Sequence, residues 1–124
     1  MELDLSPKAP SVALARWAVE GLGSGLPPAV REDVGLLVSE LVSNCIRHAQ
    51  LRDLDSITLG LRISGDMVRV DVADHGRGFD APSGPLHQPE PSEDGLGLFL
   101  VEALSDRWGI IRNGITRVWF EKDF

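Results

Sequence analysis

The chain has 124 residues, of which 43% are hydrophobic and 25% charged, so we expect one domain around one hydrophobic core. Its 12 Lys and Arg residues against 19 Asp and Glu residues give a formal net charge of −7, which argues against direct binding of nucleic acid through its phosphates. The single cysteine, Cys45, excludes an internal disulfide and a multi-cysteine zinc site.

The N-terminal half is predicted to contain one short strand and two helices. Residues 2–5 alternate polar and apolar side chains, as a strand at the edge of a sheet does. Apolar residues recur at helical spacing over residues 10–21, and the glycine-rich run at 21–25 ends that helix. The next helix is the strongest signal in the chain. It opens at residues 27–28, which are both proline, and repeats apolar residues every three or four positions as far as Ala49.

A hairpin and a loop follow in the middle of the chain. Apolar residues alternate with polar or small ones over 57–63 and again over 68–72, and a turn at 65–66 joins the two strands. The second strand ends at Asp74. Residues 81–94 are rich in Pro and Gly, so we expect a mobile loop there.

The last elements complete a pattern that predicts the fold class. A helix is expected over 95–105, and strands over 108–111 and 115–121 are joined by Asn113-Gly114, which suits a type I′ turn. Hairpin-joined strands with few helices predict an α+β fold, a two-layer sandwich in which a mixed, mainly antiparallel sheet carries helices on one face. The order does not fit the alternating units of a Rossmann fold. We therefore expect residues 1–124 to form a single domain.

Several functional classes are excluded by what the chain lacks. Only Lys8 and Lys122 occur, so there is no Gly-Lys-Ser/Thr of a P-loop and no strand lysine of a eukaryotic-type kinase. The first residues lack the basic and apolar regions of a signal peptide, and no apolar run approaches the ~20 residues that span a bilayer. We therefore expect a cytoplasmic protein without membrane contact. If it binds a nucleotide, it does so by another chemistry.

Two polar side chains on the long helix are the first candidates for a functional site. At about 100° per residue, Glu40 and Asn44 lie about 40° apart, and His48 continues the same line. This line borders the apolar stripe, so both side chains should be half-buried at the rim of the core. A carboxylate in that position costs free energy unless it has partners. A solvated helix edge would account for the two residues equally well.

Two glycine motifs are the next candidates. Asp74 follows a strand of valines and would accept a hydrogen bond from an amino group such as N6 of adenine, while Gly76 and Gly78 would let a base approach and the chain turn away. Gly95 and Gly97 open a helix, whose free amides and positive dipole end favour phosphate. Taken singly, a simple Asp-Gly turn and a flexible helix start are the alternatives.

Together these motifs resemble those of the GHKL (Bergerat-fold) ATPases, which share the histidine-kinase-like ATPase fold. Glu40-Leu-Val-Ser-Asn44-Cys-Ile-Arg47-His48-Ala49 is similar to their N box, residues 74–78 to the first glycine box, and Gly95-Leu-Gly-Leu to the second. Over essentially its whole length the chain resembles the small stand-alone anti-sigma factor serine/threonine kinases of Gram-positive bacteria and their actinobacterial relatives. In those proteins an Ala-Arg pair precedes the N box, as Ala15-Arg16 does here.

The resemblance implies ATP and Mg²⁺ as cofactors and gives each motif a role. Asn44 would ligate the Mg²⁺ that bridges the phosphates, and Glu40 would be the catalytic general base that polarises the attacking hydroxyl. Asp74 would read adenine, and residues 81–94 would be the ATP lid. The four glycines would shape the pocket and bind phosphate, in the order Gly76, Gly78, Gly95 and Gly97.

The last strand departs from the family pattern at one position. Many relatives carry a Thr immediately before the final Val-Trp/Tyr-Phe segment, close to adenine. Here Arg117 occupies that place and Thr116 lies one residue earlier. Either a bulge shifts the strand or the contact is lost, and Thr116 is kept as a candidate for nucleotide binding.

Three functions remain in competition. The favoured one is a Mg-ATP-dependent protein serine/threonine kinase that is also an anti-sigma factor, binding a sigma factor or related regulator and phosphorylating an anti-sigma-factor antagonist. The others are an ATP-binding catalytic subunit that acts like a histidine kinase in trans, and a non-catalytic nucleotide-sensing module. Arg16 is the candidate partner contact because it lies among apolar residues near a helix end, although a solvated arginine explains it equally well. The oligomeric state stays open, with a homodimer as one candidate.

Overall fold

Five strands form one sheet in the order β1-β2-β3-β5-β4, and every pairing is antiparallel. The structure is a computed structural model that describes residues 1–48, 55–74 and 93–124. Its strands are β1 (Glu2–Leu5), β2 (Ile57–Ser64), β3 (Met67–Asp74), β4 (Arg107–Arg112) and β5 (Thr116–Asp123). Strands β3 and β5 are neighbours although they are far apart in sequence, which places β4 at the edge.

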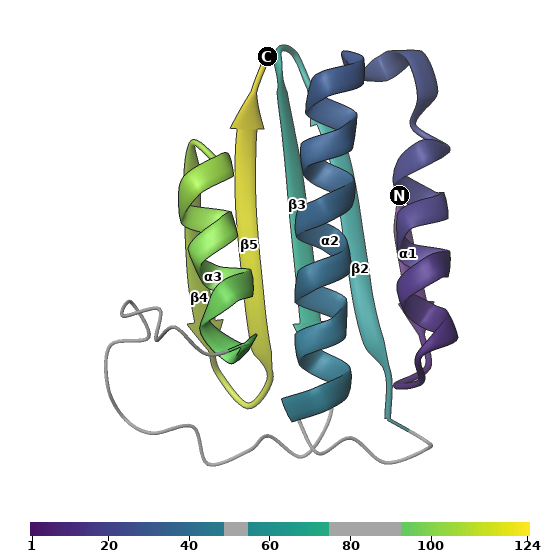
Figure 1. The fold of residues 1–124 in the computed structure, drawn as a ribbon, viewed down its shortest axis with the longest axis vertical. Helices are drawn as coiled ribbons and strands as arrows, with labels where there is room; N and C mark the ends of the chain where they lie inside the picture. The colour runs from purple at the N-terminus through teal and green to yellow at the C-terminus, as the bar shows by residue number, and fades with distance from the viewer. Residues whose placement is uncertain (49–54, 75–92) are drawn as a thin grey trace.

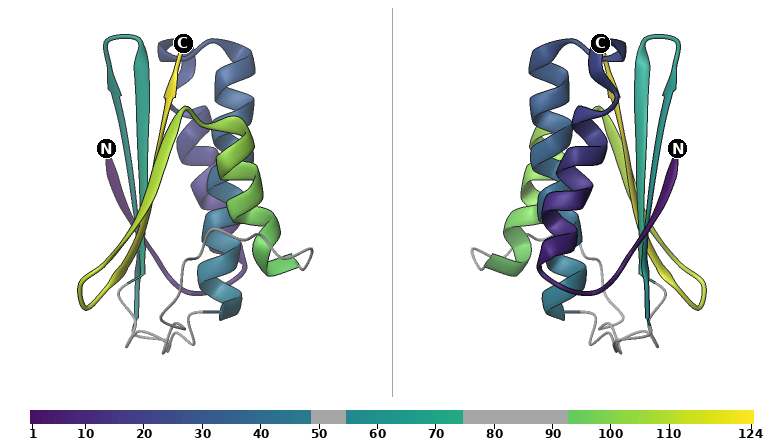
Figure 2. Two further views of the ribbon diagram at one scale, coloured as in Figure 1. Left: turned by 90° about the vertical axis from the view of Figure 1, so that its left-hand side faces the viewer. Right: turned by 90° about the vertical axis from the view of Figure 1, so that its right-hand side faces the viewer.

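Helices cover one face of this sheet (Figure 1). They are α1 (Pro10–Glu20), α2 (Pro28–His48) and α3 (Glu93–Leu104), with a short 3-10 helix, η1 (Gly23–Gly25), between α1 and α2. In Figure 1, α2 lies between α1 and α3, and the edge-on views of Figure 2 show the sheet and the helices as two layers. The predicted α+β sandwich is therefore confirmed, with an entirely antiparallel sheet among the described strands.

The hydrophobic core lies between α2 and the central strands. The apolar stripe that predicts α2 is buried along its length, at Val34, Leu37, Val38, Leu41 and Val42. Alternate residues of a strand share a face, and those of β3 and its neighbours that face the helices are buried too, among them Val68, Val70, Val72, Leu59, Leu61 and Phe120. Each such side chain contributes roughly 1.5–3 kcal/mol when it is fully buried. The contact between α2 and the sheet is thus a large source of stability.

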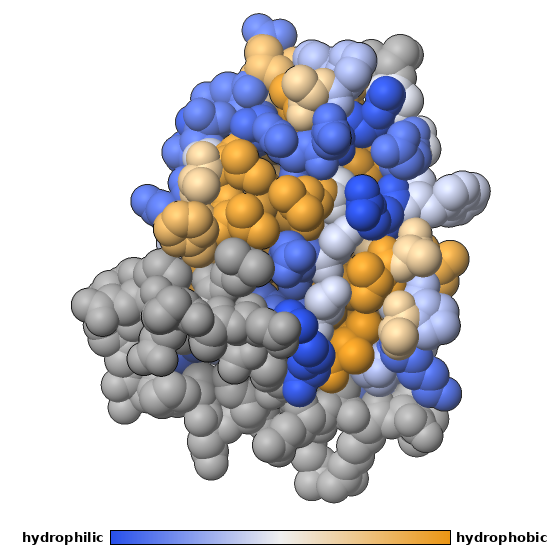
Figure 3. Space-filling view, in the orientation of Figure 1, coloured by the Kyte–Doolittle hydropathy of each residue, from blue (hydrophilic) through white to orange (hydrophobic). Residues whose placement is uncertain are grey.

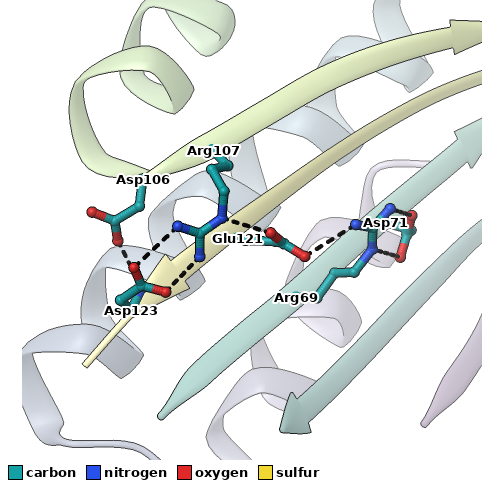
Figure 4. Close-up of polar contacts among 6 residues, drawn as sticks. All are labelled: Arg69, Asp71, Asp106, Arg107, Glu121 and Asp123. Atoms are coloured by element: carbon teal, nitrogen blue, oxygen red, sulfur yellow. Dashed lines mark hydrogen bonds and ion pairs between the residues drawn. The ribbon is translucent and has the colours of Figure 1, made fainter. Parts of the chain in front are cut away.

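The opposite, open face of the sheet carries charged side chains that pair across strands (Figure 4). Arg69 on β3 contacts Asp71 and Glu121, with its Nη1 3.2 Å from Oε2 of Glu121. Arg107 on β4 donates from Nε to Oε1 of Glu121 at 2.7 Å and also pairs with Asp123. These contacts link β3, β5 and β4 into one ladder of alternating charge.

Two details differ from the sequence prediction. Helix α3 begins at Glu93, so the last two residues of the expected lid belong to it. In the final hairpin Arg112 pairs with Thr116, so the connection has three residues, 113–115, and is not the expected two-residue turn. Gly114 within it has a φ of +91°, which residues with a side chain rarely adopt. The extra residue fixes the register of β5, and the other strands and helices lie where they are predicted.

Candidate functional site

Elements that carry the predicted motifs meet at one end of the sandwich (Figure 1). Helix α2 and strand β3 end there, and α3 and β5 begin there. The topology requires part of this, because β3 and β5 run antiparallel, so that the last residue of one lies beside the first of the other. Motifs distant in sequence are thereby gathered at a single end of the molecule.

Glu40 and Asn44 lie on α2 as predicted, half-buried beside the core. They are four residues apart and therefore about one helical turn, or roughly 6 Å, apart along the axis. Residues Leu41 and Val42 between them are buried, so the two polar side chains follow the rim of the apolar stripe. The helix thus holds a carboxylate and an amide side by side on a rigid element.

Asp74 is the last residue of β3, and only 3% of its surface is exposed. It shares its face of the sheet with the buried Val72. Its partners across the ladder are Ile57 on β2, which is fully buried, and Thr116 on β5. A carboxylate in such surroundings costs free energy unless polar groups satisfy it, so this position suits a side chain that accepts a hydrogen bond from a ligand.

Cys45 connects the helix motif with the strand motif. Burial, and secondly the charge of Asp74, raises the pKa of the Cys45 thiol to about 12. The thiol therefore stays protonated and packs against the core, as its place on the apolar stripe predicts. Because Cys45 follows Asn44 directly and feels the charge of Asp74, the predicted metal ligand and the predicted base reader lie at the same end of the core.

The register of β5 decides between Thr116 and Arg117. Thr116 pairs with Asp74, and Arg117 pairs with Ala73, one position along the ladder. Directly paired residues point to the same side of a sheet, so Thr116 shares the helix-bearing face with Asp74, and Arg117 lies on the open face. No bulge interrupts this ladder. The three-residue connection before β5 is sufficient to bring the threonine to the site.

Some of the remaining predicted site residues lie apart from Glu40, Asn44, Asp74 and Thr116. Gly95 and Gly97 are in the first two turns of α3, at the end where the site residues meet. Gly76, Gly78 and residues 81–92 of the expected lid are outside the described residues. Arg16 is exposed on α1, on the side of α2 away from α3, and so is separate from the other candidates.

Two features of the site and its surroundings were not predicted from the sequence. Nη2 of Arg47 donates a hydrogen bond to Oδ1 of Asn44 at 2.9 Å. The spacing of three residues on a helix is a signal for such a contact. On α1, Leu14 and Trp17 are exposed one turn apart.

The described residues contain no cluster of the usual metal-binding side chains. Among residues 1–48, 55–74 and 93–124 there is no group of three or more His, Cys, Asp or Glu side chains that would hold one. A metal at this site would therefore depend on the amide oxygen of Asn44 together with oxygens of a bound phosphate, which fits a hard and partly hydrated cation such as Mg²⁺. In the same ranges, no helix is both long and apolar enough to cross a membrane.

Comparison with known proteins identifies the family that has this arrangement. The family pattern of the histidine kinase-like ATPase domain matches residues 5–122, nearly the whole chain. The chain belongs to the histidine kinase-like ATPase family. ATP is therefore the nucleotide that this domain uses, and the end of the sheet with Asp74 is where the predicted ATP motifs converge.

Similar proteins and structures agree with membership of the histidine kinase-like ATPase family. The serine-protein kinase RsbW of Oceanobacillus iheyensis is 34% identical over 119 residues, which cover 86% of this chain and 75% of that protein. Proteins of the same name from Listeria innocua and Bacillus cereus are 35% and 31% identical and are covered to 74% and 73%. The histidine kinase domain of the Erythrobacter litoralis EL346 blue-light activated histidine kinase has a TM-score of 0.64 over 90% of this chain and 58% of its own, at 23% identity. That likeness shows the fold alone.

Proposed function

We propose that this histidine kinase-like ATPase domain is a Mg-ATP-dependent protein serine/threonine kinase and an anti-sigma factor. The observation that carries the proposal is the pairing of Glu40 and Asn44 on one rim of α2, at the end of the sheet where Asp74 is buried. The relatives at 31–35% identity support it, because they carry the name serine-protein kinase. The substrate in this proposal is an anti-sigma-factor antagonist, and a sigma factor or related regulator is the second partner.

Asp74 and Thr116 form the adenine end of the proposed site. The buried Asp74 carboxylate accepts a hydrogen bond from the amino group of adenine, which guanine replaces with a carbonyl. The Thr116 hydroxyl, directly opposite on β5, both donates and accepts, and in this proposal it bonds to the same base or to a water bound to it. The core behind these two residues excludes solvent and strengthens both hydrogen bonds.

Asn44 and Glu40 form the phosphate end. A Mg²⁺ ion bound through Oδ1 of Asn44 and phosphate oxygens would neutralise the charge that develops during transfer. Glu40 accepts the proton of the substrate Ser or Thr hydroxyl while the hydroxyl oxygen forms a bond to the γ-phosphorus and the bond from that phosphorus to the bridging oxygen of ADP breaks. Because both side chains are fixed on one helix, the attacking oxygen and the phosphate are held in a single frame.

The glycine motifs complete the proposed site. The amides of Gly95 and Gly97 in the first turns of α3 bind phosphate at the positive end of the helix dipole. In this proposal Gly76 and Gly78 shape the base pocket, and residues 81–92 close over the nucleotide as a lid. Hydrogen exchange measured with and without Mg-ATP tests the lid, since residues 81–92 should gain protection only when the nucleotide is bound.

The partner surface in this proposal is the outer side of α1. Trp17 is 75% exposed and Leu14 is 50% exposed one turn before it, while Arg16 is exposed between them. Apolar side chains also reach the surface elsewhere in the helical layer (Figure 3). Trp and Arg are the side chains that most often dominate the energy of a protein interface. We expect Arg16→Ala and Trp17→Ala each to weaken binding of the regulator about ten-fold or more, with ATP affinity unchanged in calorimetry.

Transfer of labelled phosphate tests the function directly. The protein, Mg²⁺ and radiolabelled ATP are incubated with the anti-sigma-factor antagonist encoded beside its gene. In a separate measurement, light scattering establishes whether the protein is a homodimer. We expect an acid-stable phosphoserine or phosphothreonine on the antagonist and none on the protein itself. An acid-labile and base-stable product would instead identify a catalytic subunit that acts like a histidine kinase in trans. Tight ATP binding without transfer to any neighbouring candidate would identify a nucleotide-sensing module.

A further inference from the structure

One contact in the site bears on how the metal enters. Nη2 of Arg47 lies 2.9 Å from Oδ1 of Asn44, and both residues lie on the same side of α2 as Glu40. A guanidinium group has only donors, so the amide oxygen of Asn44, and not its NH₂ group, must face Arg47. That oxygen is also the atom that a hard cation such as Mg²⁺ would use.

We infer that Arg47 and Mg²⁺ exchange at Oδ1 of Asn44, so that Arg47 holds this oxygen until the metal arrives with the nucleotide. The inference rests on the proposed role of Asn44 as the metal ligand. In the absence of metal, the guanidinium fixes the rotamer of Asn44 with its oxygen on the side of Arg47. When the metal binds, the Arg47 head group leaves that oxygen.

Electrostatics and geometry favour exchange over sharing. A dication bound at the amide oxygen and a guanidinium donor on the same oxygen would bring two positive charges close together, and like charges repel. Breaking the existing contact is easy. Arg47 is exposed, and the hydrogen bond joins two side chains of one helix, so breaking it disrupts no backbone hydrogen bond.

The exchange should therefore set a threshold for the metal without blocking it. An exposed, charge-assisted contact contributes little to stability, and the apparent affinity for Mg²⁺ should fall by that same small amount. This corresponds to a change of about two- to five-fold in the Mg²⁺ concentration at which nucleotide binding is half complete. Arg47 thus acts as a positioning residue for Asn44 that makes nucleotide binding more dependent on free Mg²⁺.

Calorimetric titration of ADP at a series of Mg²⁺ concentrations tests the inference without measuring transfer. We expect Arg47→Met, which keeps a long apolar stem and removes the charged donor, to lower the Mg²⁺ midpoint about two- to five-fold. Arg62→Met is the matched control. Arg62 is exposed on β2 and shares the open face with Arg69, its partner across the ladder, so its loss changes net charge equally but away from the site. The midpoint of this control should stay at the wild-type value.

The double variant separates this inference from the proposed function. In an Asn44→Ala background no Mg²⁺ midpoint is expected, so if Arg47 acts only through Oδ1 of Asn44, adding Arg47→Met should leave the ADP affinity unchanged at every Mg²⁺ concentration, and a change there would contradict the exchange. A midpoint that is unchanged or raised in Arg47→Met, while Asn44→Ala abolishes the Mg²⁺ dependence, would overturn the exchange and leave the metal role of Asn44 standing. An Asn44→Ala protein with wild-type Mg²⁺ dependence would instead overturn that metal role, and the exchange with it.

Discussion

Two carboxylates on neighbouring strands show that the two faces of the sheet use charge differently. Asp74 on β3 faces the helices, where it is buried beside Ile57 and Thr116. Glu121 on β5 faces the open side and accepts hydrogen bonds from Arg107 at 2.7 Å and from Arg69 at 3.2 Å. The guanidinium of Arg107, and to a smaller extent that of Arg69, holds the pKa of Glu121 below its usual range.

The difference separates structural charge from functional charge. On the open face the chain supplies both partners of each ion pair, and Arg69 also stacks 4.5 Å from the centre of the Trp119 ring. At the site end, polar side chains are set into an apolar rim or core, which local stability alone does not favour. Substitutions on the open face should therefore change stability and leave nucleotide chemistry intact. Substitutions at the site end should change nucleotide binding or phosphoryl transfer and leave stability nearly unchanged.

The largest effect is expected at Glu40. Glu40→Gln keeps the shape and polarity of the side chain but removes its capacity to accept a proton, so phosphoryl transfer should fall by about 10²–10⁴-fold. ADP affinity and melting temperature should stay at wild-type values. Glu32→Gln, an exposed change on the same helix, is the control. Wild-type transfer by Glu40→Gln in the labelled-phosphate assay would remove Glu40 from its catalytic role.

A smaller effect on specificity is expected at Asp74. Asp74→Asn retains a carbonyl oxygen but loses the charge-assisted hydrogen bond to the adenine amino group, so preference for ATP over GTP should fall about ten-fold or more. Stability should not fall, because an amide is easier to bury than a carboxylate. Asp71→Asn is the control, since Asp71 lies on the same strand but pairs with Arg69 on the open face. Competition binding of ATP and GTP measures the preference of both variants. An unchanged preference in Asp74→Asn would assign base reading to another residue.

Much of this site could be predicted because its signals are local. The spacing of Glu40 and Asn44 on an amphipathic helix determines that both lie on the rim, and a run of valines determines that Asp74 ends a buried strand. The same holds for the fold, since two hairpins and a long helix leave few arrangements.

The parts that could not be predicted depend on a single residue of register or on a rotamer. Asn113-Gly114 fits turns of different length, and one extra residue decides whether Thr116 or Arg117 faces the helices. The contact between Arg47 and Asn44 depends on the direction of a long side chain, which helical spacing permits but does not require. The exposure of Trp17 could not be predicted, because the spacing of apolar residues does not distinguish a buried helix face from an exposed one.

On the open face the expected effect is on stability. Glu121→Gln removes the carboxylate shared by Arg69 and Arg107, so the link between β3, β5 and β4 weakens and the melting temperature should fall by a few degrees. ADP affinity should be unchanged. Glu2→Gln, an exposed change on β1 of the same face, should have almost no effect on either. A clear loss of nucleotide affinity in Glu121→Gln would show that the two faces are coupled.

The smallest expected effect is the pH dependence of the loss of melting temperature in Glu121→Gln. Because the pKa of Glu121 is lower in the folded protein than in the unfolded chain, the unfolded state takes up the proton first as pH falls. The stabilisation by Glu121 is therefore complete above the usual carboxyl pKa of about 4.3, and it is lost as pH falls through the lower, folded value. The difference in melting temperature between wild type and Glu121→Gln should be constant from about pH 7 to pH 5 and should shrink below that range. Scanning calorimetry at several pH values measures it. A difference that persisted undiminished in acid would come from packing of the side chain and not from its charge.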